Sequence, residues 1–89
     1  MATDFKILTK DEMDELFRQD PTTANDGGFQ NFMIRLQKQA RRPSLEIRLD
    51  EDDIERIRKY AADSKHGGFQ QRILKIFGRL LDEMDQQTA

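Results

Sequence analysis

Apolar positions recur every three or four residues in four segments of this 89-residue chain, which is the spacing of one buried helix face. The predicted helices span residues 10–19, about 29–40, about 51–64 and about 69–84. The last is the most apolar, and we expect it at the centre of the core. Two further segments, 5–8 and 45–49, are too short for helices. In Leu45–Leu49 apolar and charged residues alternate, which predicts a half-buried strand.

Capping residues mark two of the helix starts. Thr9 and Glu12 have the spacing of a capping box, in which each side chain accepts a hydrogen bond from the other's backbone N–H. Asp50 is an N-cap followed by three acidic residues, where the helix dipole favours negative charge. This explains the acidic run better than a hard-cation site, because the alternating ligands and internal glycine of a calcium loop are absent.

The word Gly-Gly-Phe-Gln occurs twice, beginning at Gly27 and at Gly67. The segments before each word also match: Thr9 with Asp50 as N-caps, and Phe5 and Ile7 with Leu45 and Ile47 once one residue is inserted. We therefore predict an internal duplication with a period of about 40 residues within a single domain. The domain spans 1–89, the first pseudo-repeat 5–42 and the second 45–85.

The predicted fold class is mostly α, with two strand–helix–Gly-Gly–helix units. Under a pseudo-two-fold axis the two strands would pair as an antiparallel ribbon, with the four helices on one face. Phe29 and Phe69 would come close together under the same axis.

The glycine pairs have two interpretations. In the mechanical one, Gly67 closes a helix in a left-handed conformation and Gly68 lets the next helix pack closely. Replacing Gly67 by Ala would then cost about 1 kcal/mol or more. The alternative is a phosphate-binding nest, but no Lys, Ser or Thr follows as in a P-loop, and Asp26 would repel an anion. We favour a structural role for all six residues of the two joints, which are Gly27, Gly28, Phe29, Gly67, Gly68 and Phe69.

Gln30 and Gln70 follow the Phe of each word. Early in a helix a glutamine can satisfy a free backbone N–H, as the third residue of a capping box does. We favour this role over contact with a partner.

Composition excludes several kinds of chemistry. Cys is absent and His66 is the single histidine, so neither thiolate chemistry nor an imidazole-based metal site is expected. No nucleophile–base pair is recognisable, so we expect a non-enzymatic protein without a cofactor. No signal segment or apolar run long enough for a membrane span is visible, which favours the cytoplasm. A core this small also makes a homodimer an alternative.

Basic residues supply the candidate partner-binding surface. They lie on or after three of the predicted helices and comprise Arg35, Lys38, Arg41, Arg42, Arg56, Lys59, Arg72, Lys75 and Arg79. A solvated helix face is the plainest interpretation of such a set. A protein partner is the next, and nucleic acid follows, with the second helix of each unit in the role of a helix-turn-helix recognition helix. Against DNA, the net charge is −2 and these helices begin with Phe.

The stretch DDIERIRKYAADSKHGGFQQRILKIFGRLL, residues 52–81, resembles small proteins encoded by phages and mobile elements, among them inhibitors of the anti-CRISPR type. The resemblance covers residues 45–81 best and transfers no functional residue. It implies a non-enzymatic protein in the host cytoplasm that blocks a host nucleoprotein defence complex by protein contact. The alternatives are a helix-turn-helix-like DNA-binding regulator and a structural homodimer.

Overall fold

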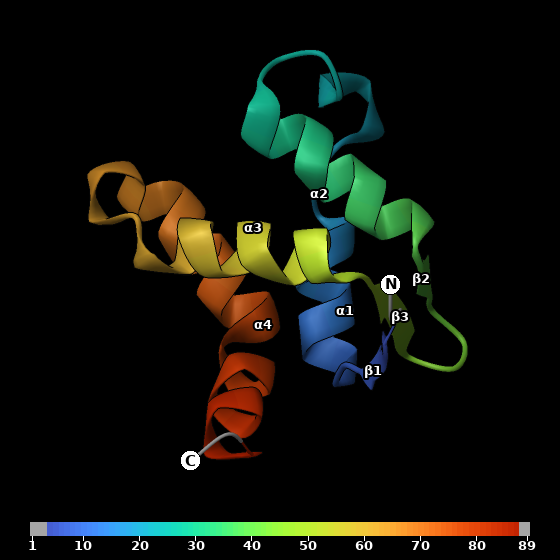
Figure 1. The fold of residues 1–89 in the computed structure, drawn as a ribbon. Coiled ribbons are helices and arrows are strands. Elements are labelled where there is room, and N and C mark those ends of the chain that lie inside the picture. The colour runs from blue at the N-terminus through green and yellow to red at the C-terminus, as the bar shows by residue number, and fades with distance from the viewer. Residues whose placement is uncertain (1–3, 88–89) are drawn as a thin grey trace.

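The computed structural model describes residues 4–87 and contains four α-helices and one three-stranded antiparallel sheet (Figure 1). Residues 1–3 and 88–89, the two ends of the predicted domain, lie outside the described residues. The elements in chain order are β1 (Asp4–Ile7), α1 (Lys10–Phe17), the 3₁₀ helix η1 (Pro21–Thr23), α2 (Gly28–Lys38), β2 (Ala40–Arg41), β3 (Glu46–Leu49), α3 (Glu51–Ala62), the 3₁₀ helix η2 (Ser64–His66) and α4 (Gly67–Gln87). The mostly α prediction with a small β part is confirmed.

The two predicted strands pair antiparallel, as expected, and a third strand joins them. The sheet order is β1-β3-β2, so β3 lies in the centre. β1 pairs with β3 so that Phe5 is opposite Arg48 and Ile7 opposite Glu46. β2 consists of Ala40 and Arg41 alone, which the sequence assigned to the end of a helix. A strand of two residues is too short to show the alternation of apolar and polar residues from which strands are predicted.

The residue-by-residue match of the two strands is wrong by one position. Opposite residues of an antiparallel pair point to the same face, so Phe5 and Ile7 share the outer face with Arg48, whereas Ile47 is buried on the inner face. Leu8 and Leu49, each directly before an N-cap, are both buried. The two strands therefore align when residues are counted back from the caps, so that Leu8 matches Leu49. No inserted residue is needed. The order strand, helix, 3₁₀ helix, helix does occur twice, and the duplication itself stays a prediction.

Both predicted helix starts are capped. The Thr9 hydroxyl accepts from the Glu12 backbone N–H at 3.1 Å, and the Glu12 carboxylate accepts from the Thr9 N–H at 2.8 Å. Asp50 accepts from the Asp53 N–H at 2.8 Å, and Asp53 accepts in return from Asp50 at 3.2 Å. The sequence predicts Asp50 as the N-cap. The reciprocal contact from Asp53, which makes this start a capping box, is an addition from the structure.

The left-handed conformation expected at Gly67 is absent. Gly67 has φ −54° and ψ −34° and is the first residue of α4, while α3 has already ended at Ala62. None of the described glycines has a φ in the left-handed region; Gly27, with φ 170°, is extended. The chain turns instead through η2, where the Asp63 carboxylate accepts from the backbone N–H of Lys65 at 3.1 Å. The left-handed residue is Leu45, with φ 59°, directly before β3.

All four helices contribute to one core on the inner face of the sheet. α4 supplies Ile73, Ile76, Phe77, Leu80 and Leu81, consistent with its expected central place. The inner face of β3 adds Ile47 and Leu49. In Figure 1 the sheet lies to the right of α1 and α3. On its outer face, Phe5 and Ile7 of β1 are exposed.

Candidate functional site

The two Gly-Gly-Phe-Gln words meet in space through their aromatic rings. Phe29 and Phe69 stack with centroids 4.1 Å apart and planes 8° from parallel, so their expected proximity is confirmed. Tyr60 of α3 meets Phe29 edge-on at 5.1 Å. Aromatic pairs in such arrangements stabilise beyond their area burial. The joints therefore hold α2, α3 and α4 together.

The polar atoms of the two words also act within the fold. Gln70 donates to the Ala61 carbonyl at 2.9 Å, so it satisfies a backbone acceptor at the end of α3 rather than the N–H that was expected. A Cβ added at Gly27 would lie 2.6 Å from Oε1 of Gln30, which places that side chain over the glycine. An anion nest requires a left-handed residue, and neither Gly67 nor Gly68 supplies one.

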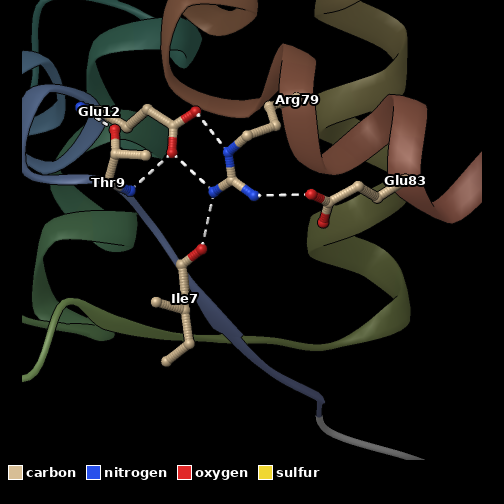
Figure 2. A network of polar contacts seen from close by, with 5 residues as sticks. All are labelled: Ile7, Thr9, Glu12, Arg79 and Glu83. Carbon is tan, nitrogen blue, oxygen red and sulfur yellow. Dashed lines mark hydrogen bonds and ion pairs between the residues drawn. The ribbon is translucent and has the colours of Figure 1, made fainter.

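Arg79, one of the predicted partner-binding residues, is engaged inside the molecule (Figure 2). Its guanidinium donates to Glu12 Oε1 at 2.8 Å, to Glu83 at 3.0 Å and to the Ile7 carbonyl at 2.8 Å. The hydrogen bond to Glu12, followed by the bond to Glu83, raises the pKa of Arg79 above its ordinary value. Glu12 is buried and also completes the cap of α1. Arg79 therefore ties α4 to α1 and β1.

Four more of the predicted cations have intramolecular contacts. Arg35 lies 3.4 Å from Asp53, and Arg72 donates to Gln19 Oε1 at 2.6 Å. The other two lie over aromatic rings, Arg42 at 4.4 Å from the centroid of Phe17 and Arg56 at 5.1 Å from that of Phe32. The contacts over the rings use the flat face of the guanidinium, and the contacts to Asp53 and Gln19 use its N–H groups, so neither is free for a partner.

Four predicted cations remain: Lys38, Arg41, Lys59 and Lys75. Within residues 4–87 their side chains make no hydrogen bond or ion pair. Lys59 on α3 and Lys75 on α4 do not share a hollow with Lys38 and Arg41, and Lys75 lines a separate one together with Arg72. Lys38 and Arg41 do come together, at the junction of α2 and β2 on the outer side of the sheet.

The outer face of the sheet carries exposed apolar and cationic side chains that have no polar partner within the described part of the chain. Phe5 is 65% exposed and Ile7 is 56% exposed. The exposed Arg48 lies on the neighbouring strand β3, and the exposed Arg41 lies one strand further, on β2. A hollow of about 220 Å³ opens there, lined by Phe5, Lys38, Gln39, Ala40, Arg41, Glu46 and Arg48. Three cations face one carboxylate in this lining. We take this face as the candidate binding site.

Phe5, Ile7 and Arg48 were missed as site residues. Their signal was present in the sequence: Leu8 precedes the Thr9 cap as Leu49 precedes the Asp50 cap. Counting back from the caps places Phe5 and Ile7 on the face where β3 has Glu46 and Arg48. Large apolar side chains that lie together on an exposed face indicate a binding surface more strongly than single exposed ones do.

The described residues offer no metal centre. No group of three or more His, Asp or Glu side chains between residues 4 and 87 is arranged to hold an ion. His66 Nδ1 lies 2.7 Å from the Asp63 carboxylate, and this hydrogen bond is the main cause that lowers the pKa of Asp63. In the same part of the chain, no helix is both long and apolar enough to span a bilayer.

The fold defines a small, mostly α protein with a three-stranded antiparallel sheet that is open on one face. No protein-family model matches the chain, and neither a curated protein nor a solved structure shows significant similarity to it.

Proposed function

We propose that this chain is a non-enzymatic binding protein of the cytoplasm that acts by contact with a protein partner through its outer sheet face. The observation that carries the proposal is the exposure of Phe5 and Ile7 beside Arg41 and Arg48, whose guanidinium groups have no hydrogen-bond or ion-pair partner among residues 4–87. Aromatic residues and arginine are enriched in protein interfaces, and an apolar centre with a charged rim is their usual anatomy.

The resemblance of residues 52–81 to phage-encoded inhibitors supports one class of partner. A protein subunit of a host CRISPR or related nucleic-acid defence complex is the first to test, and charged residues around the apolar centre would steer the encounter. The helix-turn-helix alternative has less support, because Arg72 is bonded to Gln19 and Arg79 to Glu12. Phe29, at the start of its helix, is buried and not available to read bases.

Site-specific photo-cross-linking tests the proposal. A photoreactive phenylalanine analogue at position 5, expressed in bacterial cells, should yield a discrete adduct with a protein after nuclease treatment of the lysate. The same analogue at Lys59, exposed on α3, is the matched control and should yield none. The adduct should weaken when Arg48→Glu is added. The proposal fails if position 5 gives no adduct, or one that nuclease removes.

A further inference from the structure

The hollow beside Phe5 has the chemistry of an anion site with an apolar wall. We infer that it binds a carboxylate from an acidic segment of the partner, with Arg41 and Arg48 as the recognising groups and Phe5 and Ile7 as the surface for an adjacent apolar side chain. This inference rests on the proposed function and names the partner's chemistry.

The sheet register brings the recognising groups together from separate strands. Arg48 of β3 is opposite Phe5 of β1, and Arg41 of β2 is opposite Glu46 of β3. Directly opposite residues have Cβ atoms about 4.5–5.5 Å apart. Arg48 is therefore next to the aromatic wall, and Arg41 follows one strand further, with Lys38 at the end of α2.

The guanidinium groups have unused hydrogen-bonding capacity. Arg41 is opposite Glu46 but forms no ion pair with it, and Arg48 makes no side-chain contact to an acid within the described residues. Each guanidinium can donate two parallel hydrogen bonds to one carboxylate, which a lysine cannot do. Three cations and one carboxylate in the lining leave a positive site of a size that suits one or two side chains.

The surroundings favour an acidic protein segment over nucleic acid. Glu46 lies within the lining, where it would repel a phosphate chain, and Phe5 is the single aromatic ring there. Single-strand binders need a continuous basic groove with several stacking rings, and the free cations Lys59 and Lys75 do not line this hollow. A second copy stacked face to face is disfavoured because its own three cations would oppose these.

Titration of the ¹⁵N-labelled chain with two blocked peptides tests the inference. The probes are acetyl-Phe-Glu-Leu-Glu-amide and its glutamine counterpart, acetyl-Phe-Gln-Leu-Gln-amide. The glutamate peptide should bind with millimolar affinity, shift the amide signals of residues 38–41 and 46–48, and bind at least tenfold tighter than the glutamine peptide. Arg48→Gln and Arg41→Gln should each remove most of that preference.

Arg42→Gln is the matched control, because Arg42 is next in sequence to Arg41 but lies over Phe17 and 3.7 Å from Asp14. It should change the glutamate-peptide affinity by less than twofold. Equal affinity for the two peptides overturns the inference. So does tighter binding of an oligothymidylate to the same residues, or self-association in sedimentation that Arg48→Gln abolishes.

The failures of the two proposals are distinguishable. A protein adduct at position 5 without glutamate preference refutes the carboxylate site and leaves the binding function standing. Glutamate preference without any protein adduct refutes the proposed function and leaves the chemistry of the hollow standing.

Discussion

At the scale of single residues, Arg79 shows how its neighbours decide what a cation does. The sequence places it in the candidate partner-binding set with Arg72 and Lys75. In the fold it is the partner of Glu12, a carboxylate only 8% exposed. When a buried carboxylate loses a hydrogen-bond donor, the free-energy cost of its desolvation is no longer offset, and the folded state is destabilised. Charge reversal here would disturb the fold as well as any surface.

Replacing Arg79 by Ala should therefore lower the free energy of unfolding by roughly 1–3 kcal/mol, since it removes charge-assisted hydrogen bonds to a buried acid. Urea denaturation measures the change. Arg58→Ala is the control: Arg58 pairs with Asp85 on the surface at 2.9 Å, and such pairs contribute about 0–1 kcal/mol. Equal losses in the two variants would show that the Glu12 contact is no more than a surface pair.

Gly67 and Gly68 lead to the opposite expectation from the one drawn from sequence. Both are helical, and a Cβ added at either would meet nothing within 4 Å. Gly67→Ala or Gly68→Ala should then stabilise the protein by about 0.4–1 kcal/mol, because alanine restricts the unfolded chain. Thermal unfolding should show a raised midpoint. A lowered midpoint would mean that the helix start needs glycine after all.

At the scale of elements, the first turn of α3 links helix capping to pH. The backbone N–H of Asp53 is the largest cause that lowers the pKa of Asp50 below its ordinary value of 3.8, and the nearby charge of Arg35 acts in the same direction. A folded-state pKa below the unfolded one means that the stabilisation is complete above the ordinary value. It is lost as the pH falls through the lower, folded-state value.

Asp50→Asn tests this link, because asparagine keeps a side-chain oxygen for the cap and has no proton to gain. The urea midpoint of the variant should fall less than that of the natural chain between pH 6 and pH 2.5. Asp52→Asn, an exposed change in the same turn, controls for altered net charge. An identical fall in Asp50→Asn and the natural chain would contradict the capping role.

Helices were predictable here because their signals are local. Caps such as Thr9 and long apolar stripes such as that of α4 need no knowledge of the rest of the chain. The signal for the facing of β1 is weaker, since a four-residue strand has a period-two pattern with two equally good phases. The pairing with β3, or the equal distance of the two strands from their caps, selects one phase. β2 had no local signal at all.

At the scale of the whole molecule, the candidate site arises from residues 5–48 and could not be assembled from sequence. The predicted basic set includes Lys38 and Arg41, which line this candidate site. It also includes five residues that the fold engages elsewhere, and it lacks Arg48, which lies on a strand and not on or after a helix. Which cations are free depends on contacts between distant segments, such as Arg72 with Gln19.

The division between core and site can be tested with three substitutions. Phe5→Ser combined with Ile7→Ser should change the free energy of unfolding by no more than about 0.5 kcal/mol per site, because both side chains are mostly exposed. The same pair should abolish glutamate-peptide binding. Leu8→Ala, at a side chain 1% exposed, should cost about 2–5 kcal/mol. If the Phe5 and Ile7 double variant unfolds, these two side chains stabilise the fold and are not merely a binding surface.

The bond from Arg79 to the Ile7 carbonyl also bears on aggregation. Leu8 donates to Leu45 of the neighbouring chain segment, so by the alternation of an antiparallel ladder Ile7 directs its own backbone groups to the open edge of the sheet. Unprotected edges recruit strands from other molecules. Arg79 occupies that carbonyl at 2.8 Å and hinders strand addition at this end. At this end of β1 the edge of the sheet is therefore less open to another strand than the side chains of the outer face are to solvent.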